Sequence, residues 1–177
     1  MLKFLNLEEK GKFIFNKYKI VGTDEDLPQL SKKIKNAVIT LGQIKSAKIR
    51  LKIFNKLKKL KFNLPIIKSP HSIVSQHSQI GEGTIVMHGA IVGPKVKIGK
   101  NCIINSNSLI EHGSIVGDNT HIATSVTING NVKIGSNTFI GSNTTIKQQV
   151  VIGSYSVIDM GQVIFKNCPS NSFLKKI

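Results

Sequence analysis

The sequence predicts a mainly β protein, a parallel β-helix of hexapeptide repeats behind a small α/β domain. From Val74 to Ile164, every sixth residue is Ile or Val. A second register, four positions after each of these, is small or β-branched except at Gln162. Helices need apolar residues every 3.6 positions and amphipathic strands every second position, so a strict period of six fits neither. It predicts stacked coils in which each hexad supplies a short strand and a corner.

Length and composition set the outer limits. The chain has 177 residues, 40% of them apolar, which is enough to bury a core. It has no run of about 18 apolar residues and no signal-peptide pattern, so we expect a cytoplasmic protein with no membrane partner. Cys102 and Cys168 fall on the small inner register, which favours buried free thiols over a disulfide. No His, Cys or Asp spacing suggests a metal site.

The charge is strongly positive and unevenly distributed. The net charge is +16, and residues 1–68 contribute +12 of it from 16 Lys, one Arg and five acids. Such a balance suggests nucleic acid, an anionic membrane or an anionic small molecule as partner. Because Arg50 is the one arginine, and Arg is preferred for phosphate and guanine contacts, the composition argues against nucleic acid. We expect a solvated lysine surface or attraction of an anionic small molecule.

The first 68 residues read as alternating strands and helices. Residues 1–21 predict two strands joined by a loop around 8–11. A short helix over 24–34 is expected after Thr23, a good N-cap that precedes three acids. The apolar run 37–42 predicts a buried parallel strand.

Residues 46–61 predict an amphipathic helix. Its apolar stripe is expected to face the core, with Lys and Arg on the other side; the stripe comprises Ile49, Ile53, Leu57 and Leu60.

Three segments follow from this pattern. Residues 1–68 are interpreted as a truncated, Rossmann-like α/β domain, 69–168 as the β-helix, and 169–177 as a tail. The α/β segment has no glycine-rich phosphate loop. Pro70 marks the predicted entry into the β-helix.

The corners of the coils carry a regular turn chemistry. Three hexads make one coil, so residues 18 apart stack. Gly and Asn tolerate the left-handed backbone conformation that a tight corner demands. Two columns are therefore assigned to the corners: Gly81, Gly99, Gly117, Gly135, Gly153, and Gly83, Asn101, Asn119, Asn137, Tyr155.

One outward column is apolar apart from a histidine. Exposed apolar columns are rarely left bare, so we expect a homo-oligomeric interface with three-fold symmetry on this face. The column consists of Ile85, Ile103, His121, Phe139 and Val157. His121 is either a structural histidine or a functional one.

His112 is the second candidate, because it sits at a corner beside Glu111. It lies nine residues, half a coil, before His121, so the two occupy different sides of the prism. A site that uses both would lie between subunits. The arrangement suits acyl transfer with His112 as general base. Since no Ser-His-Asp motif is present, direct attack without an acyl-enzyme is expected.

The repeat region is similar to a known family. Three features carry the resemblance: IEH at 110–112, HI nine residues after the histidine, and GNVKIG at 130–135. They resemble the left-handed β-helix sugar acetyltransferases of the sialic acid O-acetyltransferase NeuD and PglD group. The resemblance extends over most of residues 18–172. It implies a left-handed coil, acetyl-CoA as cosubstrate, a homotrimer, and a sugar or nucleotide-sugar acceptor.

The resemblance also implies residue roles. His112 becomes the proton acceptor, His121 an acetyl-CoA contact, and Gly130 the donor of a backbone N–H to the thioester. The arm of CoA is expected along Gly141, Ser142, Met160 and Gly161.

Two departures from the family are visible. Gly113 stands where the family usually has Asp or Glu, so Glu111 is the candidate substitute. The family also begins with a strand and a glycine-rich turn, so the chain is interpreted as N-terminally truncated. The predicted function is acetylation of a sugar; the alternatives are an inactive trimeric scaffold and a lysine-rich nucleic-acid-binding protein.

Overall fold

A computed structural model describes residues 4–5 and 11–175. The chain forms two compact units. The first comprises residues within 1–37 together with 55–63, and the second comprises 38–54 together with 64–177. These units do not test whether independent domains meet at residue 68, so that predicted boundary stays a prediction.

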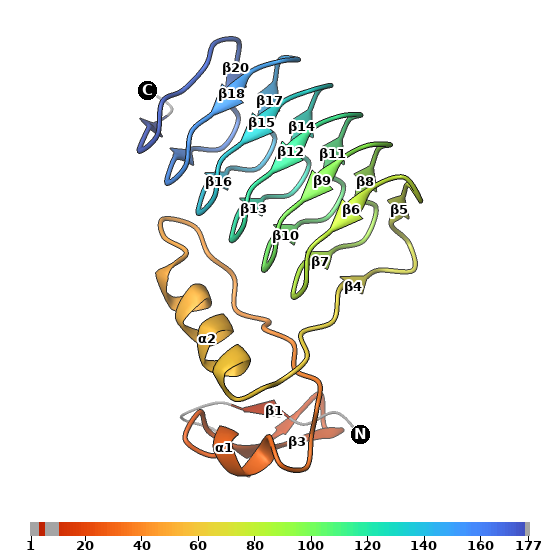
Figure 1. Cartoon of the computed structure of the whole chain (residues 1–177), viewed down its shortest axis with the longest axis vertical. Helices are drawn as coiled ribbons and strands as arrows, with labels where there is room; N and C mark the ends of the chain where they lie inside the picture. The colour runs from red at the N-terminus through yellow and green to blue at the C-terminus, as the bar shows by residue number, and fades with distance from the viewer. Residues whose placement is uncertain (1–3, 6–10, 176–177) are drawn as a thin grey trace. The chain divides into compact units, whose positions relative to one another are not determined.

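The second unit is a stack of three-sided coils, each side a two-residue strand (Figure 1). Over most of the stack, each strand pairs in parallel with the strand 18 residues further along the chain, as Ile103 does with His121. The mainly β, parallel β-helix class is therefore confirmed.

The strands form three parallel sheets. The first contains β4 (Ile67–Lys68), β7 (Ile85–Val86), β10 (Ile103–Ile104), β13 (His121–Ile122), β16 (Phe139–Ile140), β19 (Val157–Ile158) and β21 (Phe173–Leu174). The second contains β5 (Ile73–Val74), β8 (Ile91–Val92), β11 (Leu109–Ile110), β14 (Thr127–Ile128), β17 (Thr145–Ile146) and β20 (Val163–Ile164). The third contains β6 (Gln79–Ile80), β9 (Lys97–Ile98), β12 (Ile115–Val116), β15 (Lys133–Ile134) and β18 (Val151–Ile152).

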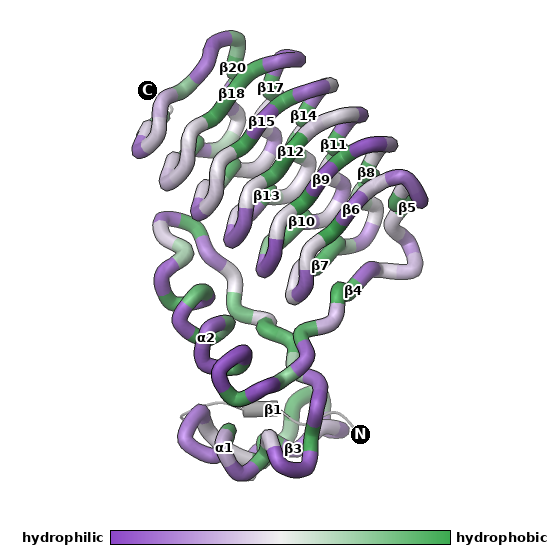
Figure 2. Tube along the Cα trace, in the orientation of Figure 1, coloured by the Kyte–Doolittle hydropathy of each residue, from purple (hydrophilic) through white to green (hydrophobic). Residues whose placement is uncertain are grey.

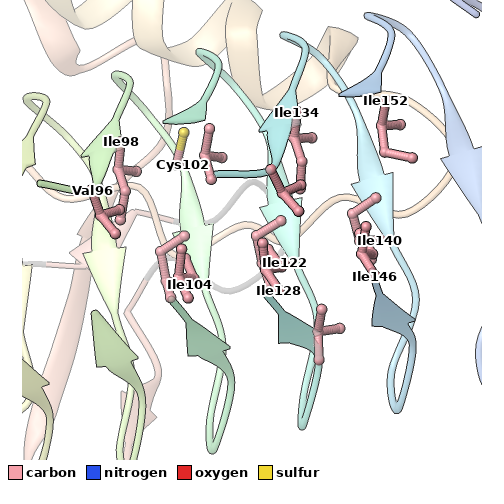
Figure 3. Packing of buried hydrophobic residues seen from close by; sticks show 14 of the residues in the cluster. Val96, Ile98, Cys102, Ile104, Ile122, Ile128, Ile134, Ile140, Ile146 and Ile152 are labelled. Carbon is pink, nitrogen blue, oxygen red and sulfur yellow. The ribbon is translucent and has the colours of Figure 1, made fainter. Parts of the chain in front are cut away.

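The Ile and Val residues at every sixth position fill the core of the β-helix (Figure 3). Ile104, Ile122 and Ile140 are fully buried and stack on one another along the coils. Figure 2 shows the same arrangement as hydrophobic segments that recur in each coil. Burial of each such side chain contributes roughly 1.5–3 kcal/mol, so the repeat itself provides most of the stability of this unit.

The hydroxyl groups of the inner register are also satisfied. Thr84 Oγ1 donates to the carbonyl of Gly99 at 2.8 Å and accepts from the N–H of Cys102. Buried polar groups are costly unless they are paired, so this ladder explains why Thr and Ser can alternate with Val in the core. Cys102 is fully buried as predicted, whereas Cys168 is only half-buried; both are free thiols.

The residue types in the two corner columns have different physical reasons. Asn101, Asn119 and Tyr155 adopt φ of 55°, 56° and 59°, the predicted left-handed conformation. The other column does not have positive φ: a Cβ on Gly81 would lie 2.6 Å from the backbone of Gly99 in the next coil. Close approach of successive coils, rather than turn conformation, therefore requires glycine in that column.

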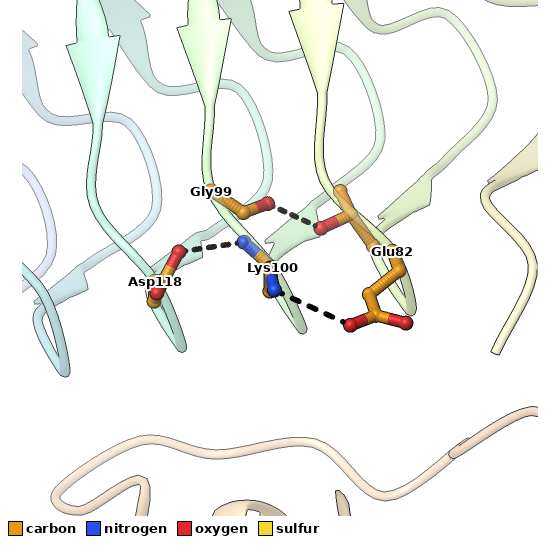
Figure 4. A network of polar contacts seen from close by, with 5 residues as sticks. Glu82, Gly99, Lys100 and Asp118 are labelled. Atoms are coloured by element: carbon orange, nitrogen blue, oxygen red, sulfur yellow. Dashed lines mark hydrogen bonds and ion pairs between the residues drawn. The ribbon is translucent and has the colours of Figure 1, made fainter. Parts of the chain in front are cut away.

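A polar network links three coils at this edge (Figure 4). The N–H of Lys100 donates to Asp118 Oδ1 at 2.8 Å, and Lys100 Nζ lies 3.4 Å from Glu82 Oε1. The ion pair is largely solvent-exposed and so contributes little to stability.

The first unit contains a three-stranded sheet with strand order β1-β3-β2, and helix α1. The elements are β1 (Phe4–Leu5), β2 (Phe13–Ile14), β3 (Tyr18–Gly22) and α1 (Leu27–Leu30). The loop predicted around 8–11 falls largely outside the described residues. The single strand expected over 13–20 is wrong: Phe15 and Asn16 adopt φ of 51° and 52° and form a tight hairpin turn between β2 and β3.

The helix predicted over 24–34 is shorter than expected. Asp26, rather than Thr23, is its N-cap, and Pro28 occupies the first turn. Proline has no N–H to donate and favours the start of a helix, which explains why α1 begins at Leu27.

The strand predicted over 37–42 is wrong. The carbonyls of Ile39 and Leu41 accept hydrogen bonds from Arg50 Nη1, at 2.8 and 2.7 Å, instead of pairing with a strand. Side-chain donors thus replace the sheet partner that the apolar run suggested.

Helix α2 (Lys48–Lys59) confirms the predicted helix but only part of its predicted buried stripe, to which Leu57 belongs. Ile49 is exposed, whereas Arg50, Phe54 and Leu57 are buried. None of the helices in the described parts of the chain is long and apolar enough to cross a bilayer.

Candidate active site

His112 lies at the corner between the second and third sheets, after β11 and before β12. Its side chain is exposed in the single chain, and its ring lies against Gly130 of the next coil. A Cβ built on Gly130 would lie 2.7 Å from both Nε2 and Cε1 of the imidazole. Absence of a side chain at position 130 therefore provides the space that the imidazole occupies.

The backbone of Gly130 offers a donor beside that ring. Its carbonyl accepts from the N–H of Gln149 at 3.0 Å, whereas its own N–H donates to no group within the described residues. A free N–H next to a candidate base is the arrangement that stabilises an oxyanion in acyl transfer. His112 and Gly130, two of the predicted site residues, are thus neighbours, and their roles stay predictions.

Neither neighbour of His112 provides a carboxylate to its ring. Within the described chain, no hydrogen bond joins Glu111 to the imidazole. Gly113 adopts φ of +69°, and a Cβ there would collide with Asn131 Oδ1. An acid at position 113 would therefore require both a strained backbone and displacement of Asn131.

His121 is in a different environment, on the first sheet. It is only 8% exposed, and Phe139 packs edge-on against it with ring centroids 5.3 Å apart. Nδ1 lies 2.6 Å from the carbonyl oxygen of Gln43, so Nδ1 carries the proton and donates. Burial lowers the pKa of His121, the Gln43 hydrogen bond partly offsets this, and the charge of Arg50 lowers it further. The neutral tautomer with an unprotonated Nε2 is favoured.

The chain itself covers His121. Gln43 Nε2 donates to the carbonyl of Asn119 at 2.5 Å, and Arg50 Nε donates to the carbonyl of Asn101 at 3.2 Å. The prediction that another subunit covers this apolar column is therefore wrong at His121. The segment 38–54 of the same chain lies there instead.

The predicted CoA-arm residues form one cluster. Gly141 packs against the backbone of Met160, with a built Cβ 2.5 Å from its nitrogen, and the N–H of Gly161 donates to the carbonyl of Ser142 at 2.8 Å. The cluster lies at the corner between the first and second sheets. His112 and Gly130 lie at the corner between the second and third. One copy of the chain therefore places the candidate residues at two separate edges.

Sequence reasoning missed Gln43, Arg50 and Asn105. Asn105 Nδ2 lies 3.4 Å from His121 Nε2, and Gln43 and Arg50 hold the covering segment. The one available signal was Arg50, a lone arginine in a lysine-rich helix. Arg satisfies several carbonyls at once with its planar fork, which Lys cannot do.

A hollow formed by the described residues lies elsewhere, on the third sheet. It is a shallow groove of about 540 Å³ whose polar lining includes Lys97, Lys100 and Asp118. It includes none of the predicted site residues, so it adds no support to their roles.

Comparisons with known proteins agree with this fold. The family "Bacterial transferase hexapeptide (six repeats)" matches residues 77–112, 113–148 and 131–161. Together these matches extend over residues 77–161, the greater part of the repeat region.

Solved structures extend the likeness to nearly the whole chain. The acetyltransferase domain of PglB from Neisseria gonorrhoeae FA1090 is 26% identical, with a TM-score of 0.88, covering 96% of this chain and 81% of that one. The same domain in complex with acetyl coenzyme A gives 26% identity and a TM-score of 0.85, covering 96% and 80%. PerB from Caulobacter crescentus, in complex with CoA and GDP-perosamine, gives 25% and 0.84, covering 88% and 74%.

These likenesses confirm the left-handed β-helix and the general resemblance to sugar acetyltransferases, whereas the narrower assignment to the NeuD and PglD group stays a prediction. No curated protein sequence compared with the chain matches it.

Proposed function

We propose that this protein transfers the acetyl group of acetyl-CoA to an amine or hydroxyl of a sugar or nucleotide sugar. The observation that carries the proposal is the fit of 96% of the chain to a domain that binds acetyl coenzyme A. The placement of His112 against Gly130 supports it, because these two residues supply a base and an oxyanion donor at one point.

His112 and Gly130 would assist the addition of the acceptor to the thioester carbonyl and then the breakdown of the tetrahedral intermediate. His112 takes a proton from the acceptor amine or hydroxyl while that atom attacks the thioester carbonyl carbon. The N–H of Gly130 stabilises the resulting oxyanion. The C–S bond then breaks, the acetyl group stays on the acceptor, and His112 returns its proton to the departing thiolate of CoA.

The acceptor class is proposed more finely from the comparisons. PerB is complexed with GDP-perosamine, and sialic acid O-acetylation is implied by the sequence resemblance. We propose a nucleotide-linked or free sugar of this kind, with the acetylated atom either nitrogen or oxygen.

The assembly is proposed to be a homotrimer in the cytoplasm. His112 and the Gly141 to Gly161 cluster lie on different edges of one prism, so a site that contains both requires a second copy. His121 is proposed to contact acetyl-CoA, and Met160, exposed on its corner, to contact the CoA arm.

The test is thiol release from acetyl-CoA, measured against a panel of sugars and nucleotide sugars. We expect turnover with at least one acceptor and its loss in His112→Ala, with the assembly unchanged by light scattering. Turnover retained in His112→Ala would refute the assignment of the base.

A second candidate, an inactive scaffold, is favoured by one observation. In the described chain, no hydrogen bond or ion pair joins a carboxylate to the His112 imidazole, so no acid of the same chain orients the candidate base. Saturable acetyl-CoA binding without turnover on any acceptor would favour this alternative.

A further inference from the structure

A long stretch of the chain contains no acidic residue. Between Asp26 and Glu82, residues 27–81 include eleven Lys and Arg50 but no Asp or Glu. Twelve of the 25 basic residues of the protein therefore lie in a segment with no local counter-charge. Such a segment attracts anionic surfaces.

Within this stretch, the N-terminal part of α2 exposes one apolar side chain, Ile49, among lysines. Arg50 and Phe54 occupy its buried side. Lys48, Ile49 and Lys52 lie on the opposite side of the helix, and all three are exposed.

The turn before α2 continues the pattern. Ile44 and Lys45, which directly precede the helix, are exposed as well. The two isoleucines are exposed by 67% at Ile49 and 63% at Ile44. We name these five residues, Ile44, Lys45, Lys48, Ile49 and Lys52, the basic–apolar surface.

A lysine face alone would be explained by solubility, but the isoleucines would not. An anionic bilayer surface fits both features, because lysines attract lipid headgroups while isoleucines enter the headgroup–acyl boundary. Nucleic acid fits less well. The one arginine is buried, and the nearby aromatic residues Phe54 and Phe62 are buried too, so none of them is available for base stacking.

We propose that the basic–apolar surface binds peripherally to anionic phospholipid membranes. Binding is reversible and involves no spanning segment, consistent with the helix lengths reported above. The inference is independent of the proposed acetyl transfer. It revises the expectation of no membrane partner.

Vesicle co-sedimentation of the full chain tests the proposal. We expect binding to phosphatidylcholine vesicles containing about 30% phosphatidylserine and little binding to phosphatidylcholine alone. Binding should weaken between 50 and 300 mM salt, since salt screens charges over roughly 10 Å at 0.1 M. Equal binding to both vesicle types would overturn the proposal.

Two variants separate the charge and the apolar contributions. Lys45→Glu, Lys48→Glu and Lys52→Glu combined should lower binding at least a hundredfold, because each lysine near an anionic membrane contributes substantially. The matched control reverses three exposed lysines at corners of the β-helix, Lys95, Lys147 and Lys166, and should retain most of the binding.

The variant Ile44→Ser with Ile49→Ser keeps every charge. We expect it to lose roughly tenfold or more in binding, because two apolar anchors are removed. Unchanged vesicle binding, or an equal loss in the corner-lysine control, would overturn the proposal. Tighter binding to single-stranded RNA than to vesicles, unaffected by the isoleucine substitutions, would also overturn it. The same holds if the isoleucine substitutions change only the self-association of the protein and not its binding to vesicles. All variants change exposed residues, so circular dichroism should show an unchanged fold.

Discussion

Gly130→Ala isolates the space that Gly130 leaves for the candidate base. Position 130 does not have positive φ, so alanine is allowed by the backbone. The new Cβ would lie 2.7 Å from Nε2 and Cε1 of His112, well inside normal carbon contact. The imidazole must therefore turn or shift by about 1 Å, because ordinary contacts begin near 3.5 Å.

The cost should fall on catalysis rather than on stability. The group that must move is the end of an exposed side chain, and alanine restricts the unfolded chain, so we expect the free energy of unfolding to change by less than about 1 kcal/mol. Displacement of a general base by about 1 Å costs roughly a hundredfold in rate. We therefore expect kcat to fall about a hundredfold, with a smaller change in the KM for acetyl-CoA.

The assay is thiol release combined with a double-mutant cycle. If Gly130 acts by leaving room for His112, adding Gly130→Ala to His112→Ala should cause no further loss. Gly42→Ala is the matched control, because a Cβ there has no neighbour within 4 Å. Full activity in Gly130→Ala, or an equal additional loss in the His112→Ala background, would refute the steric argument.

Three further outcomes are expected. Arg50→Ala should lower the free energy of unfolding by about 3 kcal/mol in urea titrations, because it leaves several buried carbonyls without donors, whereas exposed Lys52→Ala should change it by less than about 0.5 kcal/mol. The lowered pKa of His121 means that the folded state resists protonation, so stability should be full above about pH 6.5 and fall below it; His121→Gln should flatten the Tm profile between pH 7 and 5. Tyr155→Asn should stabilise the protein by about 1 kcal/mol, since Tyr155 adopts φ of 59°, while Asn137→Tyr should destabilise it similarly in the same melting assay.

The β-helix was predictable because its signal is repeated and local. Every coil uses the same Ile and Val register, so one misread residue could not shift the strands, and the corner asparagines follow from a single backbone requirement. The elements before residue 64 are short and non-repeating. There, Pro28 decides the start of α1, and a two-residue turn at Phe15 and Asn16 divides an apparently continuous strand.

The buried side of α2 shows where sequence patterns fail. Helical spacing ranks Ile49 above Arg50 as a core residue, because it scores hydrophobicity and not hydrogen-bonding capacity. The structure buries Arg50 to 1% exposure, and its guanidinium donates to the carbonyls of Ile39, Leu41 and Asn101. These acceptors lie up to 51 residues away, so no local window could have found them. Burial lowers the pKa of Arg50 to about 10, which still leaves the side chain charged at neutral pH.

The same covering segment bears on how copies of the chain would assemble. Segment 38–54 lies against the first sheet at His121, so we infer that a three-fold assembly would use the second and third sheets, which keep Ile91 and Ile115 partly exposed. His112 lies at the edge where those two sheets meet. An assembly through these sheets would therefore bring a neighbouring copy to His112. Within one chain, the Gly141 to Gly161 cluster lies at a different edge from His112. Because segment 38–54 lies on the first sheet, it covers His121 and leaves the edge at His112 open to a neighbouring copy.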